Sequence, residues 1–222
     1  MEVKGVTESI VQYLRDHIIS GDLAPGQKLA ETQLSDRIGV SRPPLREALR
    51  IMENDHLVIR IPRRGTYVTE LSVERLRQVY EAREMIECHV LDILKKKNRR
   101  ELPDVRKTLD TESVLSLPAE GDTAEMMRYL NAFTDFHVKL VQASENQWLR
   151  RFYDSITYSL ARYQFICLHI PGLTSRSYTM HGEILRLIVE GRFDTAKERL
   201  VSHIHFTTGF IEERLEKGMK NV

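Results

Sequence analysis

Residues 34–50 read LSDRIGVSRPPLREALR, and they carry the signals of two short helices joined by a tight turn. Gly39 follows a predicted helix over residues 31–38, at the position just past a helix end where glycine is favoured. Ser41 offers an N-cap oxygen to the next helix, and Pro43 suits its first turn. That helix carries its apolar residues on one face: Leu45, Ala48, Leu49 and Met52. The stretch therefore predicts a helix-turn-helix unit.

The segments on either side extend this unit. Upstream, apolar residues recur at every fourth position and predict an amphipathic helix: Val6, Ile10, Leu14 and Ile18. Downstream, residues 57–61 and 66–69 are two short β-prone pieces. Between them Pro62-Arg63-Arg64-Gly65 predicts a hairpin turn, in which glycine can adopt an unusual backbone angle. Helix, turn, helix and β-hairpin is the order of a winged helix-turn-helix.

The second helix of the helix-turn-helix also has a basic face. Arg42, Arg46 and Arg50 are spaced by four and so align, opposite the apolar residues. A planar guanidinium can grip a phosphate or the O6/N7 edge of guanine in two places, which suits DNA binding. The alternative is a solvated face on which Glu47 simply pairs with Arg50. Spacing alone leaves both interpretations open.

The composition excludes several classes of protein. The chain has 222 residues, 41% of them hydrophobic, and 33 Lys and Arg against 32 Asp and Glu, which excludes a wholly basic nucleic-acid coat. Its two cysteines, Cys88 and Cys167, are too far apart for a disulfide scaffold or a Cys-rich zinc finger, and they suit a reducing cytosol. No apolar run reaches the roughly 18–20 residues of a membrane span, and no signal peptide is visible. We expect a cytoplasmic protein that does not bind membranes.

Beyond residue 70 helical periodicity runs almost unbroken along the chain. Ser72 is a reasonable cap for the first long helix, and residues 117–121 predict a loop. The expected helices cover residues 72–97, 101–113, 122–144, 146–169, 175–191 and 194–217. We therefore predict a mainly α fold with two domains: a winged helix-turn-helix with a small β-hairpin wing over residues 1–70, and an all-α antiparallel bundle of about six helices over residues 71–222.

One charged residue of the first long helix lies where an apolar residue is expected. Arg83 occupies the inward stripe that otherwise reads Leu76, Val79, Tyr80, Ile86, Val90 and Leu94. An unpaired buried guanidinium is very costly, so Arg83 must meet a carboxylate. That carboxylate belongs either to a ligand or to the protein, with Glu87 as one candidate.

Three histidines share this placement, each on the apolar stripe of its own helix: His137, His181 and His203. Helix bundles build metal sites between facing helices, so the three favour a site for Zn²⁺ or a similar divalent ion over hydrogen-bonded core residues. Four others are expected at the surface or at a pocket edge: His17, His56, His169 and His205. No carboxylate is evident on the inner stripes near the three, which argues against a metal-dependent enzyme, because such an enzyme needs a general acid or base.

The residues themselves carry a more specific signal. The string GDLAPGQKLAETQLSDRIGVSRPPLREALRIMENDHLVIRIPRRGTYV closely resembles the N-terminal domain of the GntR family of bacterial transcription regulators, and the resemblance spans nearly all of residues 6–69. It implies binding to double-stranded DNA. By the family's pattern, the DNA contacts come from the recognition helix, the helix before it and the wing: Ser41, Arg42 and Arg46, then Thr32, then Gly65 with Arg63 and Arg64.

Residues 72–217 resemble the FadR C-terminal domain (FCD domain) of one GntR subfamily, on the pieces VYEAREMIE, DFHVKLVQASENQWL, HGEILRLIVEGRFDTAKERL and SHI. The resemblance implies that His137, His181 and His203 bind a divalent metal (Zn, Ni or Mn), which with Arg83 holds a small carboxylate effector. The family's fourth ligand, an Asp or Asn four residues before the first histidine, is replaced by Phe133. Either water or effector oxygens complete the coordination shell of the metal, or the histidines bind the effector without a metal.

Together these features predict a homodimeric, sequence-specific transcriptional regulator rather than an enzyme. We expect a repressor that reads a palindromic operator and whose affinity is controlled by a small carboxylate metabolite. Three alternatives follow from the same residues. They are a regulator that senses the metal itself, a regulator that responds to a fatty acyl thioester, and a metal-dependent enzyme.

Overall fold

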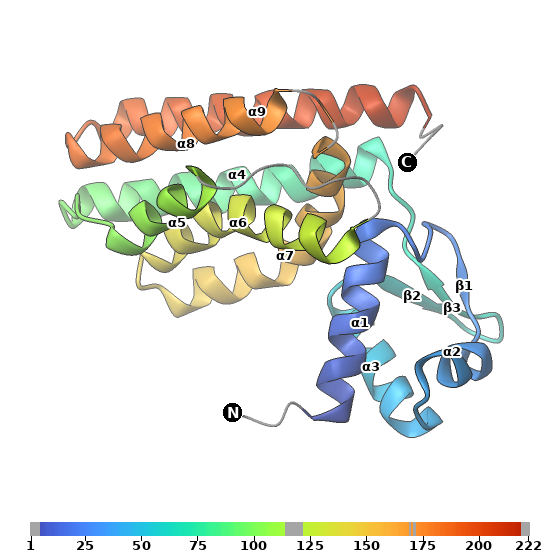
Figure 1. Ribbon diagram of the computed structural model, residues 1–222. Helices are drawn as coiled ribbons and strands as arrows, with labels where there is room; N and C mark the ends of the chain where they lie inside the picture. The colour runs from blue at the N-terminus through green and yellow to red at the C-terminus, as the bar shows by residue number, and fades with distance from the viewer. Residues whose placement is uncertain (1–4, 114–121, 169, 171, 219–222) are drawn as a thin grey trace.

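A computed structural model of the chain describes residues 5–113, 122–168, 170 and 172–218. In Figure 1 a small domain, coloured blue to teal, lies below one end of a group of long helices. This domain has the predicted order of elements with one strand added: α1 (Val6–Ser20), β1 (Lys28–Leu29), α2 (Glu31–Ile38), α3 (Arg42–Asn54), β2 (Val58–Ile61) and β3 (Gly65–Val68). The winged helix-turn-helix is confirmed.

The wing is a three-stranded antiparallel sheet in the order β1-β3-β2. In the hairpin, Val58 lies opposite Val68, and Ile61 lies opposite Gly65 at the turn. β1 pairs with the other edge of β3, where Lys28 lies opposite Tyr67. The sequence did not predict β1, because two residues are too few to show an alternating pattern.

The turn between α2 and α3 is built as the sequence indicates, with one exception. Gly39 takes a left-handed conformation with φ of 74°, and its N–H donates to the carbonyl of Ser35. Ser41 is the N-cap residue of α3, but its side chain makes no capping hydrogen bond, so that detail of the prediction is wrong. The predicted apolar face of α3 is buried in the core of the small domain: Leu45, Ala48, Leu49 and Met52.

The second domain contains the six predicted helices: α4 (Val73–Lys96), α5 (Pro103–Ser113), α6 (Thr123–Gln142), α7 (Gln147–Cys167), α8 (Leu173–Val189) and α9 (Phe193–Glu216). Ser72 caps α4 by accepting a hydrogen bond from the N–H of Arg75. The predicted loop over 117–121 and His169 lie outside the described residues. α8 and α9 run side by side above α4 in Figure 1, and the inward faces of the helices share one apolar core.

The small domain packs against α6 and α7 of the bundle. Ile19 of α1 is buried in an apolar cluster with Leu130 of α6 and with Ala161 and Phe165 of α7. Burial of such apolar side chains is worth about 1.5–3 kcal/mol each, so this contact ties the two domains together.

Polar contacts reinforce the same junction. The guanidinium of Arg15 in α1 lies 3.9 Å from the centre of the Tyr158 ring in α7. Arg162 of α7 donates to Thr69, to the hydroxyl at 2.6 Å and to the carbonyl at 2.9 Å. Thr69 belongs to the segment that joins the two domains, so α7 holds this connection directly.

Candidate DNA interface and histidine cavity

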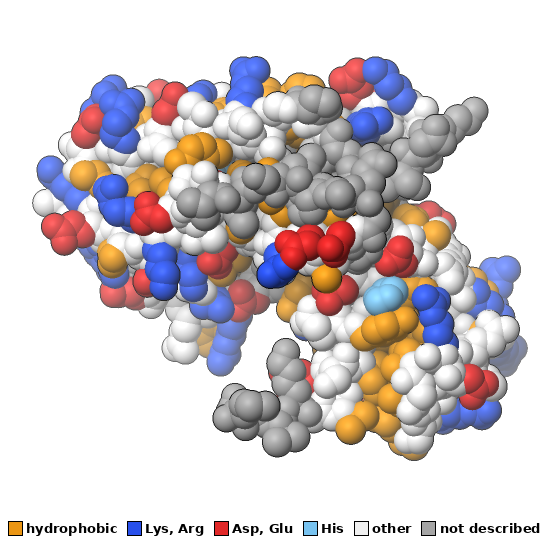
Figure 2. Space-filling model, viewed as in Figure 1, with side chains coloured by type: hydrophobic (Ala, Val, Ile, Leu, Met, Phe, Trp, Pro, Cys, Tyr) orange, Lys and Arg blue, Asp and Glu red, His pale blue; other side chains and the backbone are white. Residues whose placement is uncertain are grey.

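The exposed face of α3 and the wing enclose a basic groove of about 880 Å³. Six cationic side chains line it, Lys28, Arg46, Arg50, Arg60, Arg63 and Arg64, against two acidic ones, Glu31 and Glu47. Figure 2 shows Lys and Arg side chains gathered on the side of the small domain where the wing lies. Arg42 is also exposed, at the start of α3. A groove of this charge, with a helix along it, suits the phosphate backbone of DNA.

Two of the groove arginines pair with acids in the free protein. Arg46 Nε lies 2.7 Å from Glu31 Oε2, and Arg50 pairs with Glu47 at 3.0 Å, which is the alternative that the sequence left open. The arginine side chains remain 62% and 68% exposed. Exposed ion pairs contribute only about 0–1 kcal/mol, so phosphate oxygens can replace these carboxylates.

The remaining predicted DNA contacts are also accessible. Thr32 is exposed in the first turn of α2, and the hydroxyl of Ser41 is exposed because it is not used in capping. Gly65 has φ of 110°, as the turn prediction requires, and Arg63 is also left-handed with φ of 63°. Sequence reasoning missed Lys28 and Arg60, which line the groove from β1 and β2.

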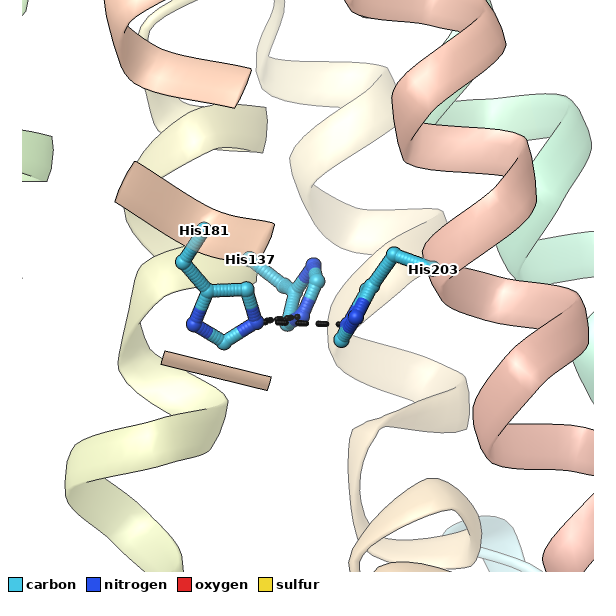
Figure 3. Close-up of side chains that lie close together, drawn as sticks. All are labelled: His137, His181 and His203. Carbon is cyan, nitrogen blue, oxygen red and sulfur yellow. Dashed lines mark hydrogen bonds between the residues drawn. The ribbon is translucent and has the colours of Figure 1, made fainter. Parts of the chain in front are cut away.

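Inside the bundle, the three predicted histidines meet. They come from α6, α8 and α9, are 2–3% exposed, and turn their rings toward one another (Figure 3). The Nε2 atom of His181 lies 3.1 Å from Nε2 of His137 and 3.2 Å from Nε2 of His203. One ligand atom from each of the three lies within 4.8 Å of the others. Tertiary structure therefore brings together side chains that are up to 66 residues apart in sequence.

Buried carboxylates stand behind two of these rings. His137 Nδ1 lies 2.9 Å from Glu87 Oε2, and His181 Nδ1 lies 3.2 Å from Glu112 Oε2. Glu87 also accepts a hydrogen bond of 2.8 Å from the hydroxyl of Tyr153. The sequence-based expectation that no inner carboxylate lies near the histidines is therefore wrong. A periodic signal was present for both acids: Glu87 follows Arg83 by four residues, and Glu112 continues the buried stripe of α5.

These carboxylates determine which ring nitrogens carry protons. Burial alone would raise the pKa of Glu87, but His137 and Arg83 outweigh it and lower that pKa to about 2. An ionised carboxylate only accepts, so His137 donates from Nδ1 and keeps a lone pair on Nε2. Burial and then the charge of Arg83 lower the pKa of His137 to about 3, which keeps the ring neutral. Burial raises the pKa of Glu112, and its hydrogen bond with His181 opposes this rise.

The three rings fit a divalent ion. The Nε2 atoms of His137 and His181 face each other at 3.1 Å, and a cation between them could take the place of the Arg83 N–H that His137 Nε2 accepts in the free protein. Adjacent nitrogens around a tetrahedral zinc ion, with Zn–N of about 2.0–2.1 Å, lie about 3.3 Å apart. The two spacings from His181 are close to this value, and the third pair lies within 4.8 Å. His203 departs from the usual pattern, because its buried Nδ1 has no partner among the described residues.

Arg83 lies at the centre of the same site. Its side chain is 0% exposed and its Nε donates to Glu87 Oε1 at 2.8 Å, so the protein carboxylate considered from the sequence is present. One Nη group donates to His137 Nε2 at 2.7 Å. The other, Nη1, is buried without a hydrogen-bond partner in the described part of the chain. Arg83 thus forms an ion pair with Glu87 and still has an N–H group on Nη1 that a ligand could use.

These groups line a cavity of about 50 Å³, with Arg83, the three histidines and Gln164 among its walls. Phe133 also lines it and packs on Tyr129, with ring centres 4.9 Å apart, so this position supplies no metal ligand. His205, two residues after His203, is exposed and pairs with Glu84 at 2.7 Å, as expected of a surface residue.

A winged helix-turn-helix joined to a helical domain with a cavity that contains buried histidines and an arginine is the architecture of a ligand-responsive DNA-binding regulator. Residues 6–68 match the model of bacterial regulatory proteins of the gntR family, and residues 78–206 match that of the FCD domain. The chain belongs to the GntR family and is a DNA-binding transcription regulator with an FCD effector-binding domain.

Named relatives agree with this assignment. The HTH-type transcriptional regulator YdhC of Bacillus subtilis (strain 168) is 30% identical over 212 residues, which cover 94% of this chain and 92% of the relative. The gluconate operon transcriptional repressor of Bacillus licheniformis is 29% identical over 144 residues, 64% of this chain and 57% of the repressor. The matches are to regulators and not to enzymes, which excludes the metal-dependent enzyme considered above.

Solved structures support the fold. A GntR transcriptional regulator from Rhodococcus sp. RHA1 superposes with a TM-score of 0.72 at 22% identity, covering 92% of this chain and 96% of the other. None of the described helices is long and apolar enough to cross a membrane.

Proposed function

We propose that this regulator is a cytoplasmic, homodimeric repressor whose affinity for its operator is set by a small carboxylate effector in the histidine cavity. Arg83 would hold the carboxylate, and His137, His181 and His203 would hold a divalent ion. The observation that carries the proposal is that three imidazole nitrogens converge beside a buried guanidinium group, one N–H of which has no partner in the part of the chain that the structure describes. The likeness to a gluconate operon repressor supports both repression and an acidic effector.

Each buried residue has a distinct role in this scheme. An ion bound at the three histidines would supply positive charge and open coordination positions for carboxylate oxygens. Glu87 and Glu112 would hold two of the rings with Nε2 turned inward. Arg83 would give up its hydrogen bond to His137 Nε2 and offer N–H groups to the effector. Because Phe133 supplies no ligand, the effector oxygens would complete the shell.

Helix α7 offers a direct route from the cavity to the DNA-binding domain. Gln164 and Leu168 line the cavity. On the same helix Phe165 belongs to the buried apolar cluster that contains Ile19 of α1, and Arg162 donates hydrogen bonds to Thr69. Suppose that α7 can take two placements in the bundle and that the effector binds more tightly to one of them. The effector would then favour one orientation of the DNA-binding domain, and this would change the operator affinity.

The homodimer and the palindromic operator follow from DNA geometry. One winged helix reads one half-site, and two symmetry-related heads bind two half-sites together with far higher affinity than one head. Light scattering of the full chain tests the dimer. A monomer at the concentrations that bind the operator would contradict it.

The central experiment measures operator affinity by fluorescence anisotropy, with DNA selected from a random pool. Chelator-free protein is first analysed for metal, and the affinity is then measured with Zn²⁺, Ni²⁺ or Mn²⁺ alone, with small carboxylic acids alone, and with both. We expect bound metal and an affinity that changes only when an acid is present. A full response to metal alone would instead identify a metal-sensing regulator.

His203→Ala is the best variant for removing a metal ligand, because the other ring nitrogen of His203 has no partner among the described residues and no buried acid there is left unpaired. His205→Ala is the matched control, two residues away and exposed. We expect only the first variant to lose metal. Less than about a tenth of an equivalent of any transition metal, with no thermal shift on adding the three ions, would leave the histidines as polar lining of a metal-free cavity.

A further inference from the structure

A cleft lies at the junction of the two domains, where the chain passes from β3 to α4 (Figure 1). Its polar lining includes His56, Glu70, Arg75, Ser159 and Arg162, and we call it the junction cleft. It shares no lining residue with the histidine cavity or with the basic groove. The proposed effector and the operator therefore leave this cleft without an assigned role.

Arg162 brings a buried charge to the wall of the junction cleft. The residue is only 4% exposed, and its two Nη groups donate to Thr69, which is a neutral partner. Its Nε is buried and has no hydrogen-bond partner among the described residues, and no described carboxylate forms an ion pair with this guanidinium. Arg83 differs, because Glu87 balances its charge. A buried charge without a counter-ion is costly, so an anion is the partner that Arg162 lacks.

The charges around Arg162 do not supply that anion. Arg75 of α4 also lines the junction cleft and forms no ion pair with a described residue. Glu70 is the one acidic residue in the lining, but its carboxylate lies beside Gly26, in the place that a side chain there would occupy. Burial lowers the pKa of Arg162 to about 10, and Arg75 lowers it further, so Arg162 still carries its charge near neutral pH. The junction cleft therefore has an excess of positive charge.

The donors of the junction cleft come from three parts of the fold. Arg75 belongs to α4, Ser159 and Arg162 belong to α7, and His56 lies between α3 and β2 in the DNA-binding domain. A carboxylate is planar and offers two oxygens and one negative charge. A phosphate group offers three terminal oxygens and a charge of about −1.5 to −2, so it suits two guanidinium groups and further donors from other directions better.

We propose that the junction cleft is a second ligand site, which binds the phosphate group of a small organic phosphate. Leu71, Val79 and Ile156 also line the cleft and would contact the organic part of such a ligand. A ligand that contacts His56 on one side and Arg75 on the other would touch both domains, and so would favour one placement of the DNA-binding domain. This inference is independent of the proposed function, because it does not involve the histidine cavity.

Isothermal titration of the full chain with phenyl phosphate and with benzoate, at constant ionic strength, tests the site. In Arg75→Gln the affinity for phenyl phosphate should fall about tenfold, the effect of one hydrogen bond to a charged group. Arg77→Gln removes the same charge two residues away, outside the cleft, and should leave the affinity unchanged. Arg46→Gln is the corresponding control for phosphate that binds in the basic groove.

Glu70→Gln should have the opposite effect. It keeps the shape of the side chain and removes the negative charge that opposes an anion, so phenyl phosphate should bind more tightly. Glu74→Gln changes the net charge equally, at an exposed position outside the cleft, and should have no such effect.

Operator affinity, measured by anisotropy, provides a second reading. Phenyl phosphate should change the affinity of the unmodified chain, and Arg75→Gln should lose this response. A response that persists in Arg75→Gln would overturn the link to the DNA-binding domain, because direct competition in the groove would explain it.

Three results of the titrations would overturn the site itself. They are no binding of phenyl phosphate to the unmodified chain, equal effects of Arg75→Gln and Arg77→Gln, and equal effects of Glu70→Gln and Glu74→Gln. If Arg75→Gln weakened benzoate as strongly as phenyl phosphate, the choice of phosphate would be wrong. Circular dichroism checks that each variant is folded.

Discussion

Replacing Arg83 by leucine tests the buried charges most sharply. From the sequence alone the substitution should be tolerated, or even stabilising, because leucine suits an apolar stripe. The structure reverses this expectation: Arg83 and Glu87 are both 0% exposed and 2.8 Å apart. Without Arg83, the Glu87 carboxylate would stay buried with only His137 and Tyr153 as donors. Removing one partner of a buried ion pair costs about 3–5 kcal/mol, so we expect Arg83→Leu to lose that much stability.

The double variant Arg83→Leu/Glu87→Leu separates this cause from a loss of packing. It removes the unpaired Glu87 carboxylate and leaves only two neutral donors, His137 Nδ1–H and the Tyr153 hydroxyl, without an acceptor. The double variant should therefore lose less stability than the single variant. Arg77→Leu on the same helix is the control: Arg77 pairs with Glu212 but is 61% exposed, so this substitution should leave stability nearly unchanged.

Urea unfolding followed by circular dichroism measures these differences, and a thermal scan provides a second reading. At about 2–4 °C per kcal/mol for a chain of this size, Arg83→Leu should lower the melting temperature by roughly 6–20 °C. A loss below about 1 kcal/mol in Arg83→Leu, or a larger loss in the double variant than in the single one, would refute the reasoning.

Three further predictions concern DNA, metal and coupling. Arg42→Ala and Arg46→Ala should each weaken operator binding by about 1–3 kcal/mol if they reach base edges. Anisotropy at matched salt measures this. If either variant bound the operator as tightly as the unmodified protein, the assignment of that arginine to a base contact would be wrong. Phe133→Asp restores an anionic ligand and should tighten Zn²⁺ binding in a competition assay with a chelator; unchanged affinity would show that position 133 does not face the ion. Arg162→Met removes the hydrogen bonds to Thr69 and should leave effector affinity unchanged while reducing the effector's influence on operator affinity. An unaltered response would mean that this contact does not transmit the signal.

The winged helix-turn-helix was predictable because its signals are local. Helix periodicity, the glycine after α2 and the turn before β3 each depend on a few neighbouring residues, and the structure follows them. The same is true of the six bundle helices, whose bounds lie within two residues of the prediction. Arg83 and the three histidines were also found from sequence, since a polar residue on an apolar stripe is visible from periodicity alone.

What surrounds those four side chains was decided only by tertiary structure. Glu112 and Gln164 lie on other helices. Their neighbours in sequence do not indicate that Glu112 contacts His181 or that Gln164 lines the cavity beside Arg83. The rotamer of each buried group depends on partners tens of residues away, and protonation follows from those partners rather than from residue type. Periodicity gives the face of a helix on which a side chain lies. Only the packing of the helices determines which groups meet there, and hence what chemistry the cavity can do.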